Sequence, residues 1–111
     1  MILLEFGAEL NKLAENYISP LHLAANGHHE IVRLLLLKGA KISQMDICGN
    51  TALHYAAAKN FPHCTSELIN NPSVDIMLEN EDGKTAYHLA VENKAQLSQA
   101  VIESFISNVI S

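Results

Sequence analysis

A seven-residue pattern occurs three times in this chain of 111 residues, at Ser19–Ala25, Thr51–Ala57 and Thr85–Val91. Each copy begins with Ser or Thr and carries His at its fourth position. The copies start 32 residues apart (19 to 51) and then 34 residues apart (51 to 85). Self-similarity at a period of roughly 33 residues is typical of chains built from stacked supersecondary units. The pattern therefore predicts a repeat architecture.

Each copy also predicts the start of a helix. Its Ser or Thr can accept a hydrogen bond from an unpaired helix N–H, and Pro20 in the first copy suits the first helical position. In the first unit Asn26–Gly27 should end that helix, and a second helix is expected over Glu30–Leu37, just before Gly39. A polar, extended stretch and a turn at Asp46–Gly49 then lead into the next copy. Two helices and a loop thus make one unit.

These units resemble those of the ankyrin-repeat family. The resemblance is carried by Ser19–Ala25, by Gly27–Leu36 with Gly39 and Ala40 after it, and by the turn residues Asp46, Gly49, Asn50 and Thr51. It implies an all-α solenoid of stacked helix-turn-helix units with hairpin-like loops, about three units preceded by an N-terminal half-unit. Apolar residues spaced along Gln96–Ile110 fit an amphipathic terminal helix that covers the end of the stack.

A single domain is expected over residues 1–111. Its parts are the end of a truncated unit at 1–15, a unit at 16–45, a unit at 46–79 and a terminal unit with a capping helix at 80–111. The apolar residues Met1, Ile2, Leu3, Leu4 and Phe6 should form half a helix against the first full unit. Since its other side would lack cover, we expect either a weak homodimer through this N-terminal end or a longer parent chain.

The charge balance argues against a nucleic-acid partner. Lys and Arg number 7 against 12 Asp and Glu, for a net charge of −5, whereas phosphate binding requires a cationic surface. No apolar stretch approaches the ~18 residues that a membrane span needs, so no membrane insertion is expected. Cys48 and Cys64 lack the spacing of a metal finger, and a secreted domain of this size usually carries more bridges. We therefore expect free thiols and an intracellular protein, cytoplasmic or nuclear.

A histidine stands at the same slot of every unit: His22, His54 and His88. A catalytic group is seldom copied once per repeat, so the recurrence indicates a structural role. In the ankyrin-repeat family this imidazole ties neighbouring turns together through hydrogen bonds. The helix caps beside it share that structural role: Ser19, Thr51 and Thr85.

The remaining chemistry predicts neither catalysis nor metal binding. His63 and Cys64 are adjacent, but neighbouring residues on a helix point about 100° apart and no third ligand lies at zinc spacing. Cys48 lacks a cationic neighbour that would lower its pKa. No other nucleophile combines with a free base and an orienting acid. The sequence therefore predicts no enzyme activity, no catalytic residue, no metal site and no cofactor.

The family binds its partners through residues that flank the turn glycine and through the end of the first helix. On this chain the resemblance implies the following partner-binding residues: Tyr17, Ile18, Ile47, Cys48, Asn50, Phe61, Glu81, Asp82 and Lys84. We expect Tyr17, Ile18, Ile47 and Phe61 to form a connected apolar patch. Cys48 should lie beside that patch, and Glu81 and Asp82 should border it. The alternative is that Met45, Ile47 and Leu78 cover neighbouring loops.

The function that this pattern favours is protein–protein recognition. The chain would act as a non-catalytic scaffold, adaptor or inhibitor that binds another protein through its loop tips and concave helix face. The alternative is a regulatory or targeting segment of a larger protein, such as an enzyme, a channel or a secreted effector.

Overall fold

The computed structural model describes residues 10–110. Within them the chain forms one short 3-10 turn, η1 (Glu15–Tyr17), and no strand. The helices are α2 (Pro20–Ala24), α3 (His29–Leu37), α4 (Ala52–Ala58), α5 (Pro62–Ile69), α6 (Ala86–Glu92) and α7 (Gln96–Ile110). The half-helix expected before residue 7, and the dimer contact expected from it, lie outside the described residues.

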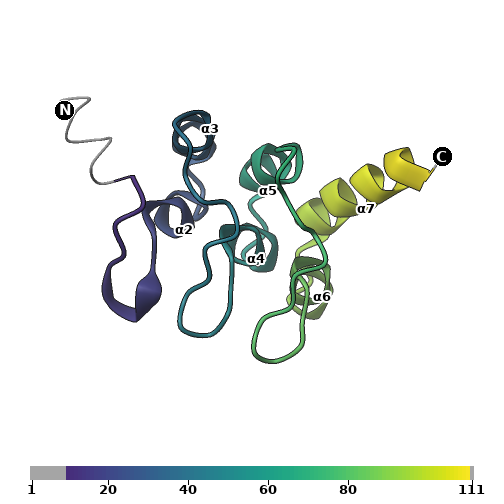
Figure 1. Ribbon diagram of the computed structural model, residues 1–111. Helices are drawn as coiled ribbons and strands as arrows, with labels where there is room; N and C mark the ends of the chain where they lie inside the picture. Colours follow the sequence, from purple (N-terminus) through teal and green to yellow (C-terminus); the bar gives the residue numbers. More distant parts are fainter. Residues whose placement is uncertain (1–9, 111) are drawn as a thin grey trace.

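The helices form two layers (Figure 1). Helices α2, α4 and α6 make an inner layer, and α3, α5 and α7 make an outer one. Neighbours within a layer touch, because α4 contacts both α2 and α6 while α5 contacts both α3 and α7. Three loops project from the inner layer on the side away from α3 and α5. The result is the all-α solenoid that the repeat predicted.

Small side chains let the inner helices approach each other. Ala24, Ala56 and Ala90 occupy the same slot of successive units, and each is buried. A larger side chain at this slot would force the helices apart, because protein interiors pack to near-crystalline density. The outer layer supplies larger side chains to the core, among them Leu35, Leu68 and Ile102.

The turn between the two helices of each unit requires a left-handed backbone. Gly27 supplies it in the first unit, with φ 116°, and α2 is correspondingly shorter than α4 and α6. In the other units Asn60 (φ 61°) and Lys94 (φ 56°) hold the equivalent position. A lysine there carries strain, because only glycine enters this region without steric cost.

The second unit's outer helix is more polar than its neighbours, and its polar core atoms are paired. Thr65 and Ser98 are both buried, and their hydroxyl oxygens lie 3.0 Å apart across the contact between α5 and α7. The Thr65 hydroxyl also donates to the carbonyl of Phe61 at 2.9 Å, and the Ser98 hydroxyl to that of Ala56 at 3.4 Å. Buried polar groups cost little free energy when they are paired in this way.

Candidate functional site

Each inner helix begins at a hydroxyl cap paired with the recurring histidine. The side chains of Ser19, Thr51 and Thr85 accept from the backbone N–H of His22, His54 and His88 respectively. In return the Nδ1 atom of each histidine accepts from the backbone N–H of its cap residue, at 3.1 to 3.2 Å. Because Nδ1 is an acceptor, Nε2 carries the ring proton and can donate.

The first two histidines use that Nε2 proton to hold the next loop. His22 Nε2 donates to the carbonyl of Asn50 at 2.8 Å, and His54 Nε2 donates to that of Lys84 at 3.0 Å. His22 and His54 are buried. Burial lowers the pKa of both rings, although hydrogen bonds to these carbonyls oppose the shift. The neutral tautomer that this joint needs is therefore the favoured one.

The three loops share one hairpin geometry. The N–H of Asp46 donates to the carbonyl of Asn50, and the N–H of Asn80 to that of Lys84, both at 2.9 Å. A side-chain oxygen of the first residue also accepts two backbone N–H groups within each of these loops. In the first loop the N–H of Ala14 donates to the carbonyl of Ile18 at 2.7 Å, but alanine has no side-chain acceptor.

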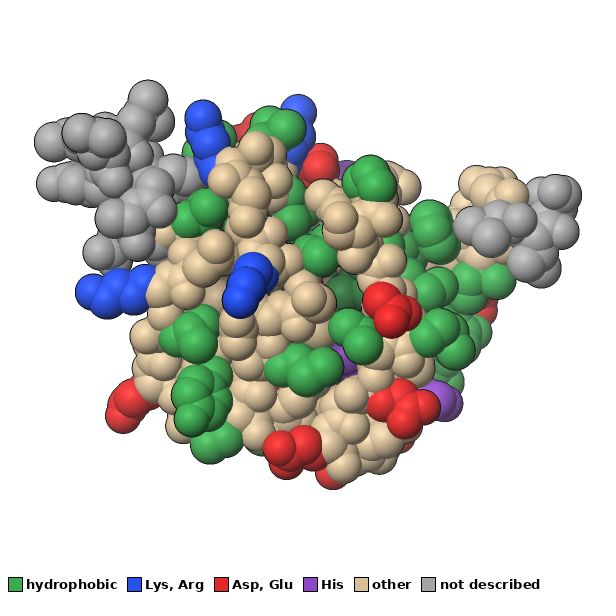
Figure 2. Space-filling view, viewed as in Figure 1, with side chains coloured by type: hydrophobic (Ala, Val, Ile, Leu, Met, Phe, Trp, Pro, Cys, Tyr) green, Lys and Arg blue, Asp and Glu red, His purple; other side chains and the backbone are tan. Residues whose placement is uncertain are grey.

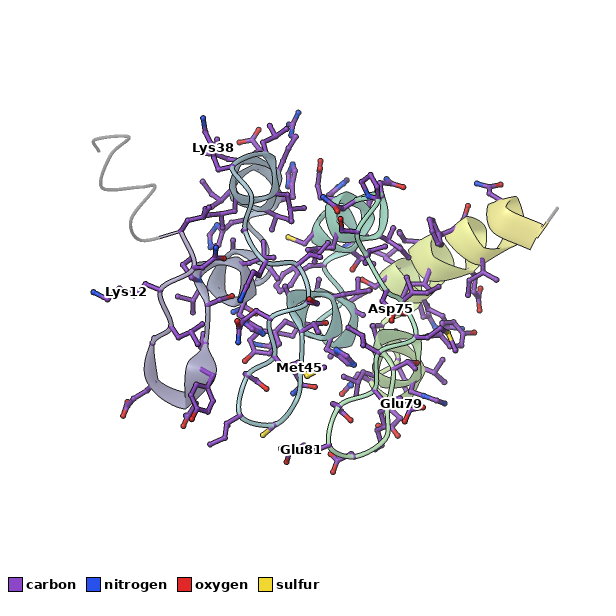
Figure 3. All side chains as sticks on the ribbon, in the orientation of Figure 1. Lys12, Lys38, Met45, Asp75, Glu79 and Glu81 are labelled. Carbon is purple, nitrogen blue, oxygen red and sulfur yellow. The ribbon has the colours of Figure 1, made fainter. Side chains whose placement is uncertain are left out.

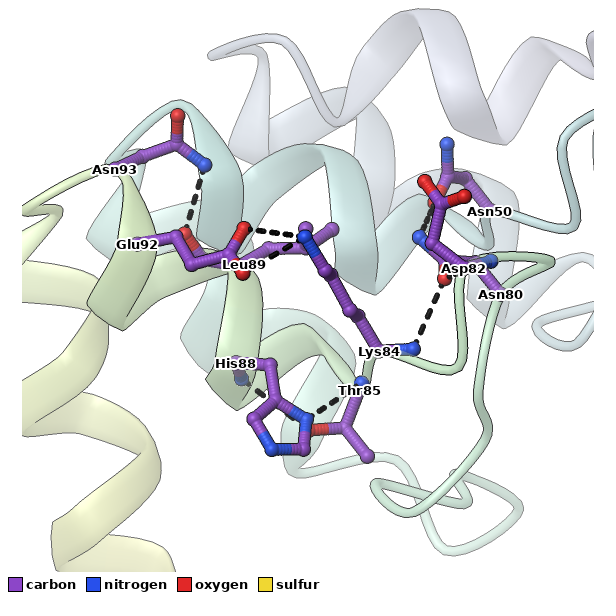
Figure 4. A network of polar contacts seen from close by, with 9 residues as sticks. All are labelled: Asn50, Asn80, Asp82, Lys84, Thr85, His88, Leu89, Glu92 and Asn93. Atoms are coloured by element: carbon purple, nitrogen blue, oxygen red, sulfur yellow. Dashed lines mark hydrogen bonds and ion pairs between the residues drawn. The ribbon is translucent and has the colours of Figure 1, made fainter.

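Successive hairpins are joined tip to tip. The N–H of Ile47 donates to the carbonyl of Asn16 at 2.8 Å, and the N–H of Glu81 donates to that of Cys48 at 3.0 Å. Asn80 Nδ2 also donates to Asn50 Oδ1 at 2.9 Å (Figure 4). These bonds fix the hairpins as a continuous edge beside the inner helices.

A groove of about 480 Å³ lies between the inner helices and the hairpins. Its walls take residues from all three units: Ile18, Leu23, Asn26, Asp46, Asn50, His54, Tyr55, Ala58, Lys59 and Leu89. Leu23 is 56% exposed there, a high value for a leucine on a core-forming helix. Leucine, tyrosine and leucine again hold the same slot of the repeated pattern, at positions 23, 55 and 89.

Tyr55, which lines the groove, makes three side-chain contacts. Its hydroxyl donates to Asp46 Oδ2 at 2.6 Å, and its ring lies 4.8 Å from that of His22. Lys59 Nζ stands 5.7 Å from the ring centroid, within the range of a cation–π contact. Burial, reinforced by the bond to Asp46, raises the pKa of Tyr55. Burial also raises the pKa of Asp46, but hydrogen bonds from Tyr55 and from the loop backbone outweigh it and lower the pKa of Asp46 overall.

Comparison with known proteins agrees with this geometry. A protein-family model described as "Ankyrin repeats (many copies)" matches residues 21–69. The chain is 38% identical to the mouse B-cell lymphoma 3 protein homolog over 82 residues, which are 70% of this chain and 18% of that protein. It is 40% identical over 90 residues to mouse ankyrin repeat domain-containing protein 37, covering 79% of this chain and 56% of the relative.

The chain belongs to the ankyrin-repeat family. A third relative, alpha-latrotoxin-Lh1a of Latrodectus hasselti, is 31% identical over 103 residues, 91% of this chain and 7% of the toxin. The chain therefore spans less than two thirds of the length of each of these relatives. Ankyrin repeats are generally protein-interaction modules and are generally not catalytic.

The ankyrin hairpins display most of the residues expected to bind a partner. Tyr17 is 57% exposed and Ile47 is 52% exposed, and Cys48 is exposed beside them. Tyr17 fills the slot that Gly49 and Gly83 hold in the other hairpins, and it adopts the same left-handed backbone, with φ 61°. Figure 2 shows hydrophobic side chains at the lower left of the molecule, around the first hairpin, together with an acidic side chain.

Acidic residues gather on the loop that joins the second ankyrin unit to the third. Asp75, Glu79 and Glu81 all lie on the segment between α5 and α6 (Figure 3). Glu81 and Asp82 are exposed at its tip. The ammonium of Lys84 is committed to Glu92, 2.7 Å away, so this cation neutralises an inner-helix carboxylate instead of the tip (Figure 4).

Four of the expected partner-binding residues also make contacts within the protein, namely Ile18, Asn50, Phe61 and Lys84. Ile18 is half-buried in the groove wall. The side chain of Asn50 accepts from Asn80 of the next hairpin, and its carbonyl accepts from His22 on α2. Phe61 was expected in the apolar patch with Tyr17 and Ile47, but it lies at the opposite end of α4. There it packs against the core, with its ring 3.2 Å from the position that a Cβ on Gly27 would occupy. Phe61 is thus a contact between units.

The third histidine also departs from the expected pattern. His88 keeps the cap bonds to Thr85, but it is exposed and its Nε2 has no hydrogen-bond partner among residues 10–110. Its role in joining loops is therefore confined to its own unit.

The sequence predicted a concave helix face as a binding surface, but it did not single out Leu23, Tyr55 and Lys59 as residues that line it. Leu23 and Tyr55 share one slot with Leu89, so the aligned repeats held a signal for the row that lines the concave side.

No group of three His, Cys, Asp or Glu side chains that could hold a metal ion occurs in the described part of the chain. Both cysteines are free thiols, Cys48 exposed and Cys64 buried. Burial raises the pKa of Cys64 and so opposes formation of a reactive thiolate. Among residues 10–110 no helix is both long and apolar enough to cross a membrane.

Proposed function

We propose that this ankyrin-repeat chain is a protein-recognition module whose partner lies in the groove of the inner helices and along the hairpin tips. The observation that carries the proposal is the groove of about 480 Å³, whose walls come from all three units. An exposed leucine beside a fixed tyrosine offers an apolar anchor site. The amide of Asn50 and the ammonium of Lys59 provide polar groups at its border. Such a combination is typical of protein interfaces.

The hairpin tips extend this surface. The proposed contact residues are Tyr17, Ile18, Ile47, Cys48, Asn50, Glu81, Asp82 and Lys84, with Leu23 and Tyr55 added from the groove. The first two tips offer apolar side chains, whereas the third offers carboxylates, so the partner should be apolar at one end of its contact surface and basic at the other. A scaffold, an adaptor and an inhibitor would all use such a surface.

The test compares two leucine substitutions. Leu23→Glu changes the groove, and Leu37→Glu changes α3 at a position that is 76% exposed on the outer layer. Both are exposed on helices, so neither should unfold the chain. A partner captured by the wild type should be retained by Leu37→Glu and lost by Leu23→Glu. Retention by both variants would contradict the proposed site.

A second arrangement is that the chain recognises partners on behalf of a larger protein, as a regulatory or targeting segment. It is favoured by the relatives, because the chain spans only 18% of the mouse B-cell lymphoma 3 protein homolog and 7% of the latrotoxin. Sequencing the transcript on both sides of the coding segment separates the two arrangements. In both, we place the protein inside the cell, in the cytoplasm or nucleus, where free thiols such as Cys48 and Cys64 persist.

A further inference from the structure

The hydrogen bonds between successive units show which backbone groups a hairpin must supply to cover the unit before it. In each joint the incoming hairpin donates one backbone N–H to the tip carbonyl of the preceding hairpin. Three residues later the same hairpin offers a backbone carbonyl to the Nε2 of the preceding histidine. The N–H and the carbonyl belong to Ile47 and Asn50 in one joint and to Glu81 and Lys84 in the other.

The third unit presents the same acceptor and donor without that cover. His88 Nε2 and the carbonyl of Asp82 have no hydrogen-bond partner within residues 10–110. A Cβ on Gly83 would meet nothing within 4 Å, whereas one on Gly49 would lie 3.0 Å from the backbone N of the next hairpin. Val91 is 47% exposed, although the alanines at its slot in the other units are fully buried. Exposed, unpaired backbone groups of this kind act as templates for another chain.

The outer-helix half of this end is already closed by polar contacts. The Tyr87 hydroxyl donates to Glu103 at 2.6 Å, and Gln99 Nε2 donates to the same carboxylate at 3.1 Å. Counted from the left-handed turn residue, the slot of Glu103 holds Leu36 and Ile69 in the other units. Burying the Glu103 carboxylate under another helix would cost free energy, so this slot favours contact with water. The open part is therefore the hairpin half, which a short turn can cover without a helical unit behind it.

The negative charge of the hairpin half at the end of the stack favours a basic partner. Glu79, Glu81 and Asp82 are exposed there, and Lys84 is bonded to Glu92 (Figure 4). A second copy of this chain would have to offer its first hairpin, whose Glu15 holds the slot of Ile47 and Glu81 and would bring another carboxylate to the same place. Like charges close together oppose association.

From this we infer that Asp82, Gly83, His88 and Val91 form a docking site for a tight backbone turn of a partner protein that carries Lys or Arg beside the turn. The turn donates an N–H to the carbonyl of Asp82 and, three residues later, accepts from His88 Nε2, while an aliphatic side chain covers Val91. This inference rests on the proposed function and adds a second contact, at the end of the stack, to the groove.

The test is a titration of the isotopically labelled full chain, followed by amide resonances. The probe is a backbone-cyclised peptide with the sequence Gln44–Thr51, which supplies the two groups at the right spacing, with Ile47→Arg to make it basic and Cys48→Ser to prevent oxidation. We expect shifts at Asp82, Gly83, His88 and Val91 with an affinity of roughly millimolar, weakened in high salt. An Ile47→Glu version of the peptide should bind at least about tenfold more weakly.

Two protein variants check the site. His88→Ala should reduce the shifts severalfold, and Val91→Ser should reduce them without touching the histidine. His28→Ala, another exposed histidine, should leave them unchanged. Absence of shifts up to several millimolar peptide would overturn the inference. Shifts confined to Leu23 and Tyr55 would also overturn it, although they would leave the proposed groove intact. Shifts at Asp82, Gly83, His88 and Val91 on concentrating the protein without peptide would overturn it too, because a second copy would then be the occupant.

Discussion

Replacing His54 with alanine removes the side-chain bond that joins the second unit to the third hairpin, while the backbone bond from Glu81 to Cys48 stays. The imidazole accepts from the buried Thr51 N–H at 3.1 Å through Nδ1 and donates to the carbonyl of Lys84 at 3.0 Å through Nε2. After the substitution the carbonyl of Lys84 keeps its bond from the N–H of Asn80. Among residues 10–110 the N–H of Thr51 has no other acceptor, so it would remain buried without a partner.

An orphaned buried N–H costs about 1–3 kcal/mol, and the lost ring adds a packing term. We therefore expect His54→Ala to lower the free energy of unfolding by about 2–3 kcal/mol. His88→Ala is the matched control, because it removes the same cap bond from an exposed ring that joins no further hairpin. Water can replace that bond, so the control should cost less than about 1 kcal/mol.

Urea denaturation of the three proteins, followed by circular dichroism, measures both differences. The His54→Ala midpoint should fall well below that of His88→Ala. Equal losses for the two variants would refute the reasoning, because the joint between hairpins would then contribute nothing beyond the helix cap.

Three further predictions follow from the same structure. Since burial lowers the pKa of His22 and His54 in the folded state, stability should be complete above the unfolded value near 6.5 and decline as pH falls below it; urea midpoints unchanged between pH 7.5 and 5.5 would contradict this. Lys94→Gly should raise the free energy of unfolding by about 0.5–1 kcal/mol by relieving a left-handed φ, and a lower thermal midpoint would count against the assigned backbone. Gly49→Ala should cost at least about 1 kcal/mol more than Gly83→Ala, because both strain φ but only the first meets the next hairpin; equal costs in thermal melts would exclude the contact.

The repeated pattern was sufficient to predict the solenoid, because its signals are local. The hydroxyl caps, the break at Asn26–Gly27 and the stop before Gly39 each depend on a few neighbouring residues. The terminal helix was predicted over Gln96–Ile110, and α7 has those bounds. The stacking that orders these elements follows from the near-constant period.

The surface was harder to predict, because it depends on distances along and between helices. Phe61 was assigned to the tip patch as an end-of-helix residue, but α4 separates it from Ile47, and its ring fills space beside Gly27. Leu23 was not singled out in the sequence, since only the three-dimensional stack shows that its slot faces the groove. His88 matched its two counterparts in sequence, and its exposure arises from its place at the end of the row of hairpins.

The most direct test of the proposed recognition surface is hydrogen–deuterium exchange of the full chain with and without its captured partner. If the partner lies in the groove and on the tips, protection should appear in the hairpin around Ile47 and in α4, with its inner-layer neighbours α2 and α6. The outer helices α3 and α5 should exchange as in the free protein. Protection confined to α3 and α5 would contradict the account.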